Sequence, residues 1–433
     1  MTPQPEQRRE LSVAMLARVE GEGGLHVVVE GDRVVDVQLR IFEPPRFFEA
    51  FLRGRSYLEP PDLTARICGI CPVAYQFSAC LAIEDACGVV VPDELRLLRR
   101  LLYCGEWIES HALHVFMLHL PDLLGYDGAI EMAADHRALV ESALRIKRVG
   151  NELMAVVGGR SVHPINVRVG GFHRLPEPAE LRALRPALVR ALDETLAAVP
   201  LLAGLTYPEV QQPHLYLALD AGEDYPLERG SLRTSTGLTA PVSAFGTHVR
   251  EHHVPHSNAL QGRFDGQPYV VGPLARYTLH SQLLAPVARQ AASAAGLGPT
   301  CRNPFRSILV RVVELVHALA EAVRIIDTWD GAPVAAIEVP AQAGEGHGAT
   351  EAPRGLLYHR YRIDADGTVR AAQIVPPTAQ NQPAIEADLR AVVEANLDLA
   401  DDALTAVCET AIRAYDPCIS CATHFLRLQV TRR

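Results

Sequence analysis

Two pairs of cysteines have the residue type and spacing that point most clearly to chemistry in this sequence. Cys68 and Cys71 form one C-x-x-C pair near the start of the 433-residue chain, and Cys418 and Cys421 form another near its end. This spacing lets both thiolates of a pair face one ion. Four thiolates on two loops make a soft ligand cage, which suits Zn, Ni or Fe and excludes Mg or Ca.

A structural zinc site is one explanation of this pattern, and a buried catalytic metal site is the other. In a compact zinc ribbon the two pairs lie about 15 to 20 residues apart. Here most of the chain separates them, so the site must tie the beginning of the fold to its end. This separation favours a buried catalytic metal centre.

The other five cysteines have no partner at ligand spacing, and we expect them to be small core residues: Cys80, Cys87, Cys104, Cys301 and Cys408. The chain then has no ligand set for an iron-sulfur cluster of its own. Electrons from the metal centre must therefore leave through another subunit.

The composition is that of a globular protein, with 48% hydrophobic and 21% charged residues. A formal net charge of −10 and scattered basic residues argue against nucleic acid as a partner. The arginines near the N-terminus are not followed by an apolar signal segment, and no stretch approaches about 18 consecutive apolar residues. These features predict a cytoplasmic protein with no direct membrane span.

Hydrophobic periodicity indicates the elements that must position the cysteines. Residues 12–42 alternate apolar and polar side chains around a Gly31-Asp32 turn, which predicts a small antiparallel sheet. A hairpin is predicted over 357–375 around Asp366-Gly367. Helical spacing predicts helices over these segments: 92–124, 133–157, 177–202, 270–296, 305–328 and 383–413.

The fold class that follows is α+β and mainly α, with a central long-helix bundle and small peripheral antiparallel sheets. We expect one large catalytic domain over residues 1–433. Within it, 92–330 would form the helical core, and 204–265, rich in Gly, Pro, His and Ser, an irregular excursion over that core. Residues 350–382 would hold the hairpin and an active-site loop.

Five motifs together resemble the large subunit of nickel-iron hydrogenases, from Arg18 to His424. They are R-V-E-G-E-G at 18–23, R-I-C-G-I-C at 66–71, G-G-R-S-V-H-P at 158–164, E-A-P-R-G at 351–355 and D-P-C-I-S-C-A-T-H at 416–424. The resemblance implies the fold of that subunit and the reversible heterolytic cleavage of H2 into protons and electrons.

The resemblance also implies a nickel-iron centre on the four cysteines. Cys68 and Cys418 would be terminal ligands of Ni, while Cys71 and Cys421 would bridge Ni and Fe. The iron would carry one CO and two cyanides. Its diatomic ligands would lie in a cradle formed by five residues: Pro353, Arg354, Leu357, Pro377 and Thr378.

By the same resemblance, Cys418 would take the proton from H2, Glu20 would relay it outward, and Arg354 would polarise H2 as a fixed cation. Without the motif, Glu20 would be a surface carboxylate in a sheet turn. Arg354 would then be a structural arginine paired with a carboxylate such as Asp416. A magnesium ion is also implied, with Glu49, the carbonyl of Ile374 and His424 as ligands.

The sequence departs from the family pattern at two positions. Tyr75 stands where many members have a histidine after the first cysteine pair, and Glu22 stands where another histidine is common. Neither change removes a metal ligand, but Tyr75 alters the hydrogen bonding expected around Cys71. His163 fits the third motif, and we expect it to be structural.

The chain continues past His424 with residues 425–433, which resemble the tail that family precursors lose once nickel is in place. We expect this tail to be removed in the active enzyme. The resemblance thereby implies a maturation endopeptidase and nickel-insertion factors as partners.

The resemblance is greatest to soluble cytoplasmic enzymes that couple H2 to NAD(P). This chain has no G-x-G-x-x-G motif, so NAD(P) would bind diaphorase-type flavin subunits and electrons would reach them through an iron-sulfur small subunit. Three alternatives stay open: a hydrogen-sensing regulatory subunit, the related quinone-site subunit of respiratory complex I, and a zinc-stabilised scaffold. The four cysteines argue against the complex I subunit, which lacks them.

Overall fold

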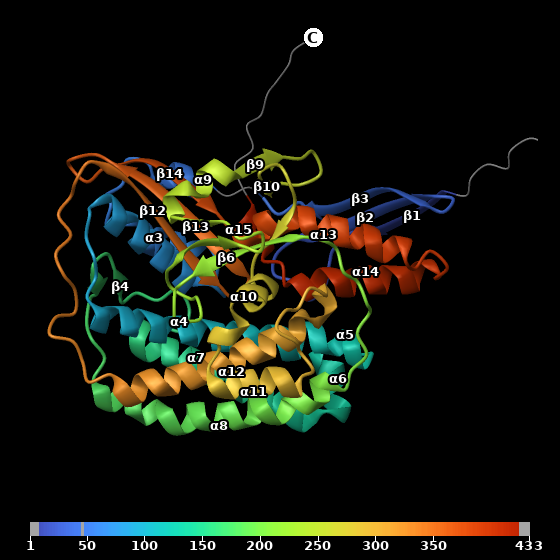
Figure 1. The fold of residues 1–433 in the computed structure, drawn as a ribbon, viewed down its shortest axis with the longest axis horizontal. Helices are drawn as coiled ribbons and strands as arrows, with labels where there is room; N and C mark the ends of the chain where they lie inside the picture. Colours follow the sequence, from blue (N-terminus) through green and yellow to red (C-terminus); the bar gives the residue numbers. More distant parts are fainter. Residues whose placement is uncertain (1–7, 45–46, 424–433) are drawn as a thin grey trace, which may run out of the picture.

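Long helices form the body of the molecule. The computed structural model describes residues 8–44 and 47–423. The four longest helices pack against one another in the lower half of Figure 1: α4 (Asp93–Leu113), α7 (Arg137–Gly158), α8 (Pro178–Ala203) and α12 (Ser307–Thr328). Helix α12 is buried along most of its length because it is apolar nearly all round. The predicted central bundle is therefore present.

Helices α4 and α7 approach closely where two glycines face each other. A Cβ atom added at Gly150 would lie 2.8 Å from the carbonyl oxygen of Gly105 and 2.8 Å from the backbone nitrogen of Glu109. Only the missing side chains allow this approach, so the glycines fix how the two helices cross. Beyond α4 the predicted helix continues as a π-helical segment, His114–His119 (η2), and then as α5 (Leu120–Leu124).

Two three-stranded antiparallel sheets lie above the bundle (Figure 1). The N-terminal sheet consists of β1 (Arg8–Val13), β2 (Gly23–Glu30) and β3 (Arg33–Ile41), as predicted. The second consists of β12 (Gly344–Ala352), β13 (Gly355–Ile363) and β14 (Val369–Val375), so the predicted hairpin gains one further strand.

Helix α3 (Pro72–Ala86) lies directly on strand β12. A Cβ atom at Gly346 or Gly348 would clash with the backbone carbonyl oxygen of Ala82 or Ser78 in that helix. The glycines of β12 therefore let the helix that follows Cys71 rest against the sheet.

The prediction of an irregular excursion over 204–265 is wrong. A parallel pair and antiparallel pairs join four strands in the order β11-β6-β7-β8, and β9 and β10 form a separate hairpin. The strands are too short for an alternation of apolar and polar side chains to be recognised in the sequence. Their bounds are β6 (Leu215–Asp220), β7 (Ser231–Thr234), β8 (Thr239–Ala240), β9 (Val249–His253), β10 (Leu260–Phe264) and β11 (Tyr269–Val270).

Two predicted helices are interrupted. The segment 270–296 divides into α10 (Pro273–His280) and α11 (Pro286–Ala294), because Pro286 fits a first helical turn and not a helix interior. The segment 383–413 divides into α13 (Pro377–Glu394) and α14 (Asp401–Tyr415). Helix α13 begins before the predicted start and contains Pro383 in its interior.

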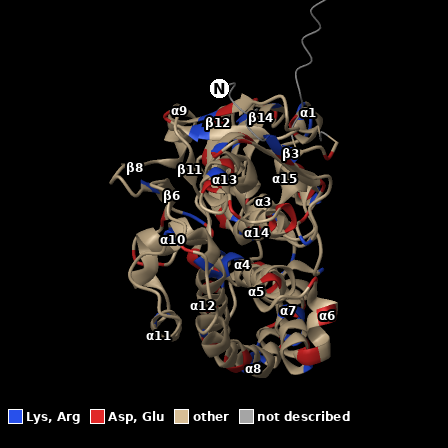
Figure 2. Ribbon diagram, turned by 90° about the vertical axis from the view of Figure 1, so that its right-hand side faces the viewer, with Lys and Arg blue, Asp and Glu red and all other residues tan. Residues whose placement is uncertain are grey.

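The remaining elements are short: α1 (Phe48–Leu52), α2 (Pro60–Thr64), η1 (Ala65–Ile67), α6 (Ala129–Asp135), β4 (Val167–Arg168), β5 (Gly171–Phe172), η3 (Val242–Ala244), α9 (Phe245–His248), η4 (Ser281–Leu283), η5 (Pro304–Arg306) and α15 (Ile419–Ala422). Acidic and basic residues are mixed with one another over the helices and strands of the molecule (Figure 2). No helix in the described part of the chain is long and apolar enough to cross a membrane.

Candidate metal centre

The structure brings the two cysteine pairs together. The four Sγ atoms all lie within 4.8 Å of one another, and all four residues are buried. The Sγ atoms of Cys68 and Cys418 are 3.5 Å apart, as are those of Cys71 and Cys421. Among the described residues, this is the one cluster of Cys, His, Asp or Glu with the geometry to hold a metal ion.

Separate elements hold each pair in place. Cys68 directly follows η1, and Cys71 precedes the first turn of α3. In α4, the buried carboxylate of Glu106 accepts hydrogen bonds from the backbone nitrogens of Val73 at 2.6 Å and Ala74 at 3.3 Å. This carboxylate binds backbone donors in the first turn of α3 that have no partner within the helix, so α4 fixes the helix that follows the first pair.

The second pair lies at the start of α15: Cys418 directly precedes this short helix and Cys421 lies within it. The backbone nitrogen of Ile419 donates to the carbonyl of Glu20 at 2.8 Å, which joins this helix to the R-V-E-G-E-G segment. The Thr378 hydroxyl, in the first turn of α13, accepts from the backbone nitrogen of Cys418 at 2.9 Å. The hydroxyl hydrogen of Thr378 thus stays available to donate to a bound group.

The protonation of the thiols suits a cation between them. Hydrogen bonding with Cys418 holds the pKa of Cys68 well below its usual value. Burial raises the pKa of Cys418 well above its usual value. Burial is also the main cause that raises the pKa of Cys421 to about 11. Four buried thiolates cannot coexist without compensation, and a soft metal ion supplies it when the thiols ionise.

Arg354 lies in the turn between β12 and β13 and faces the same cluster. Its Nε donates to the carbonyl of Asp416 at 2.8 Å and its Nη2 to the Asp416 carboxylate at 3.0 Å. Burial by itself lowers the pKa of Arg354, but Asp416 and then the charge on Cys418 raise it well above its usual value. The guanidinium is therefore a fixed cation, and Arg354 forms the ion pair with Asp416 that the sequence suggested.

One nitrogen of Arg354 is left over. Its Nη1 is buried and has no hydrogen-bond partner within residues 8–44 and 47–423. Buried polar groups are rarely left unpaired, so this nitrogen calls for an acceptor that the protein does not supply. A small anionic ligand beside the cysteines, such as cyanide on iron, fits that need.

The rest of the predicted cradle is buried around the cluster. The carbonyl of Pro353 accepts from Arg276 Nη2 at 3.1 Å and from Arg311 Nη1 at 3.4 Å, so buried cations hold the turn that carries Arg354. Leu357 is fully buried, and Pro377 is buried at the start of α13. Both side chains are closed to water, and their place beside a bound iron stays a prediction.

Glu20 lies against Cys418. Its Oε2 is 3.0 Å from the Cys418 Sγ and accepts from the backbone nitrogen of Ser420 at 3.1 Å. The Ser420 hydroxyl in turn donates to Glu43 Oε2 at 3.0 Å. Glu20 is thus a half-buried carboxylate in contact with a cysteine thiol and not a surface group in a turn.

Glu43 was missed by the sequence reasoning. The sequence places it six positions before Glu49 in the segment E-P-P-R-F-F-E, and nothing there indicates its contact with Ser420. The departure at Glu22 lies at the surface, and its contacts with Glu43 come from its backbone: its nitrogen donates to Glu43 Oε2 at 3.2 Å and its carbonyl accepts from the Glu43 nitrogen at 3.2 Å.

Two of the three residues expected to bind magnesium lie together. Glu49, in α1, accepts a hydrogen bond at its Oε1 from the backbone nitrogen of Ile374 at 2.8 Å. His424 lies outside the described residues. The magnesium site stays a prediction.

Two other motif residues support the loops. His163 has a positive φ of 48°, and its Nδ1 lies 2.7 Å from the carbonyl oxygen of Ala65, just before Cys68. Arg18 donates to the carbonyl of Leu118 at 2.9 Å and pairs with Asp122. Both contacts are structural, as predicted for His163.

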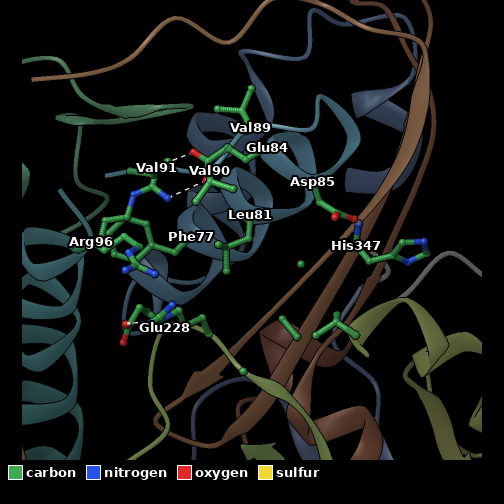
Figure 3. Close-up of a pocket in the computed structure, with 16 residues that line it drawn as sticks. Phe77, Leu81, Glu84, Asp85, Val89, Val90, Val91, Arg96, Glu228 and His347 are labelled. Carbon is green, nitrogen blue, oxygen red and sulfur yellow. Dashed lines mark hydrogen bonds and ion pairs between the residues drawn. The ribbon is translucent and has the colours of Figure 1, made fainter. Parts of the chain in front are cut away.

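A separate cavity of about 300 Å³ lies between α3, β12 and the segment around Glu228 (Figure 3). Its lining includes Phe77, Leu81 and the run Val89–Val91 but none of the four cysteines. The Glu84 carboxylate at its edge is bound by Arg99 at 2.9 and 2.6 Å. This cavity therefore takes no part in the cysteine cluster.

Comparison with known proteins identifies the group to which this geometry belongs. The sequence matches the model of a family described as nickel-dependent hydrogenase over residues 46–143 and 247–424. This chain belongs to the nickel-dependent hydrogenase family. The hydrogenase is 34% identical over 424 residues to sulfhydrogenase 1 subunit alpha of Pyrococcus furiosus, which covers 96% of this chain and 98% of the relative.

A second relative is the beta subunit of the NAD-reducing hydrogenase HoxS of Cupriavidus necator, 29% identical over 96% of this chain and 95% of the relative. The solved structure of an NAD+-reducing NiFe hydrogenase in the H2-reduced state superposes with a TM-score of 0.86 and 26% identity, covering 97% of this chain and 100% of that chain. The fold of this hydrogenase is therefore that of a nickel-iron hydrogenase large subunit, as predicted.

Proposed function

We propose that this hydrogenase subunit holds a nickel-iron centre on Cys68, Cys71, Cys418 and Cys421 and uses it to cleave or form H2. The observation that carries the proposal is the buried cluster of four Sγ atoms within 4.8 Å of one another. The unpaired Nη1 of Arg354 and the burial of Leu357 and Pro377 support an iron that carries CO and cyanide. When bound, such a centre supplies the Lewis acidity and the electron acceptance that the cleavage of H2 requires.

The chain's own residues would manage the proton. Cys418 is the thiol in contact with Glu20, at 3.0 Å, so Cys418 would hold the proton first and pass it to the Glu20 carboxylate. Ser420 holds the Glu20 carboxylate through its backbone nitrogen and binds Glu43 through its hydroxyl, so both contacts fix the loop beside Glu20. Glu20 is more exposed than the fully buried Cys418, so a proton passed from Cys418 to Glu20 moves toward solvent.

Arg354 would act beside the cluster as a fixed cation. Asp416 holds two of its nitrogens, so the guanidinium is already oriented before H2 arrives and needs no reorganisation. Arg354 and Thr378 would also donate hydrogen bonds to the cyanide nitrogens.

Electrons would leave through an iron-sulfur small subunit. Between the two cysteines of the first pair, Gly69 is exposed, and Val162, which lies next to it, is 46% exposed. This surface is the point where the cysteine loop comes closest to solvent, which suits a docked partner that accepts electrons. The relatives, which are named as alpha and beta subunits, support an assembly of several subunits.

The acceptor would be NAD(P), bound on diaphorase-type flavin subunits in the cytoplasm. The NAD-reducing enzymes among the relatives and the solved structures support this choice. A maturation endopeptidase and nickel-insertion factors would act earlier, during assembly. A hydrogen-sensing subunit remains the second candidate, because it would use the same cysteine cluster.

The experiment is an isotope-exchange assay on the complex purified without oxygen. We expect it to contain nickel and iron and to exchange D2 with protons of water. Cys421→Ser, which removes one of the four sulfur ligands, should abolish both the metal content and the exchange. A wild-type complex that contains zinc in place of nickel and shows no exchange would contradict the proposal.

A further inference from the structure

Arg311 is a buried cation near the metal centre to which the proposed mechanism gives no task. It lies in α12 and is 1% exposed. Its Nη1 donates to the Asp416 carboxylate and to the carbonyl of Pro353, at 3.4 Å in both cases, and its Nη2 donates to the carbonyl of Tyr415 at 3.1 Å. Arg311 therefore binds two separate parts of the site: the turn that carries Arg354 and the end of α14, which leads into the second cysteine pair.

One carboxylate serves two guanidinium groups at this point. Asp416 is 2% exposed, and a different arginine binds each of its carboxylate oxygens. Arg354 Nη2 lies 3.0 Å from Oδ1, and Arg311 Nη1 lies 3.4 Å from Oδ2. The backbone of Asp416 has a positive φ of 54°, a strained conformation that persists only where the surrounding contacts fix it. One negative charge cannot neutralise two positive ones, so the two arginines keep an excess of positive charge beside the cysteines.

Two other buried carboxyl groups nearby, in α12 and β12, already have a cation of their own. Glu314 is bound by Arg276 through two hydrogen bonds of 2.8 Å. Glu351 is bound by the same arginine at 3.0 Å. Burial raises the pKa of Glu351 to about 7, so this group carries only part of a negative charge at neutral pH. Neither group therefore neutralises the two arginines on Asp416.

Both of these arginines stay charged at neutral pH. Burial is the main cause that lowers the pKa of Arg311, to about 10, and the charge on Arg354 lowers it further, whereas Asp416 raises it. Burial also lowers the pKa of Arg354, but Asp416 and then Cys418 raise it well above its usual value. The two guanidinium groups thus repel each other, and the charge of Arg354 acts on the cysteines.

We propose that Arg311 occupies one oxygen of the Asp416 carboxylate and thereby maintains the positive field that Arg354 exerts on the metal centre. Without Arg311, the carboxylate would serve Arg354 alone, and more of the charge on Arg354 would be neutralised. Arg311 is a positioning residue in this role, since it acts through Asp416 and Arg354. The inference rests on the proposed nickel-iron centre.

The test compares infrared spectra of complexes purified without oxygen. Arg311→Met removes the charge and keeps a long side chain, whereas Arg311→Lys keeps the charge. In Arg311→Met the stretch of iron-bound CO should move to lower wavenumber, because a weaker positive field leaves more electron density on iron. In Arg311→Lys the band should stay near its wild-type position. Arg99→Met is the matched control: Arg99 is 3% exposed and pairs with Glu84 beside the separate cavity, so its loss should leave the CO band unmoved.

A CO band at the wild-type position in metal-loaded Arg311→Met would overturn the inference. An equal shift in Arg311→Lys would also overturn it, because the shape of the side chain and not its charge would then be the cause. If Arg311→Met does not retain its metals, Arg311→Lys decides: bound metals with a band near the wild-type position would support the inference, and lost metals or a shifted band would overturn it. A wild-type spectrum with no CO band would refute the proposed function instead, which separates the two failures.

Discussion

Cys418 and Glu20 form the contact on which the proton chemistry depends. The carboxylate oxygen lies 3.0 Å from the sulfur, and the backbone nitrogen of Ser420 holds that same oxygen at 3.1 Å. The segment that carries Cys418 and Ser420 therefore orients the Glu20 carboxylate toward the thiol. A group held in this way can accept a proton without first moving.

Glu20→Gln tests this role. The amide can still accept from Ser420 but cannot take up a proton, so nickel content should stay unchanged. The rate of D2 exchange with water should fall by about 10² to 10⁴, the usual contribution of a positioned acid-base group. Glu22→Gln is the control, because the Glu22 side chain lies at the surface. Full exchange activity in Glu20→Gln would remove Glu20 from the proton path.

The sequence revealed the residues that hold metal better than the residues that support them. The cysteines were found because thiolates at C-x-x-C spacing have a restricted chemistry, and Glu20 was found only through its motif. Glu43 and Glu106 carry no such signal, since their partners Ser420 and Val73 lie in other parts of the chain. A carboxylate that accepts from a distant backbone nitrogen cannot be recognised before the fold is known.

At the scale of elements, α4 holds the helix that follows the first cysteine pair. Glu106 is fully buried, and its two hydrogen bonds end on backbone nitrogens of α3. Burial raises the pKa of Glu106 well above its usual value, while the hydrogen bond from Val73 lowers it. The carboxylate thus fixes the first turn after Cys71.

Two substitutions of Glu106 distinguish the packing of its side chain from its role as a hydrogen-bond acceptor. Glu106→Leu leaves both backbone donors buried and unpaired, which should destabilise the protein by about 2 kcal/mol or more and reduce nickel content. Glu106→Gln keeps a carbonyl acceptor and should retain most of the nickel. Thermal unfolding and metal analysis of both variants provide the measurement, and equal metal content in the two would contradict the assignment.

The crossing of α4 and α7 gives a prediction that concerns stability alone. Gly150→Ala places a methyl group 2.8 Å from the Gly105 oxygen, so the helices must move apart at a cost of about 1 to 3 kcal/mol. Gly246→Ala is the control, because a Cβ atom there meets nothing within 4 Å. Unfolding in denaturant should show a loss of stability for the first variant only, and an unchanged Gly150→Ala would contradict the close crossing.

Element boundaries followed from the sequence where periodic segments were long. The segment 305–328 is observed as α12 (Ser307–Thr328), whereas 204–265 hides strands of two to six residues. The prolines explain the other differences. Pro286 starts a new helix, while Pro383 is tolerated inside α13, so the same residue type gave opposite outcomes that only packing decides.

At the scale of the whole molecule, the metal centre joins the two ends of the chain. The helical bundle and the sheet of β12, β13 and β14 lie between residues 66–71 and 416–423 in the chain, and the fold brings these two segments together. The tail, residues 425–433, begins two positions after Thr423, the last described residue. Its position so close to Cys421 suits a segment that is removed once the metals are in place.

The intact mass of active protein tests the removal of the tail. We expect the subunit in the active complex to end at His424, while protein made without nickel should keep residues 425–433. A control digestion of both samples should show the same peptides up to residue 423. Active subunit that carries the complete tail would contradict this prediction.

The central claim is that the four cysteines hold a nickel-iron centre with CO and cyanide on iron. An infrared spectrum of the complex purified without oxygen tests it most directly, because no amino-acid side chain absorbs where these ligands do. We predict one CO band and two cyanide bands, with nickel and iron in equal amounts. A spectrum without these bands, from protein that contains zinc at the cysteines, would contradict the account.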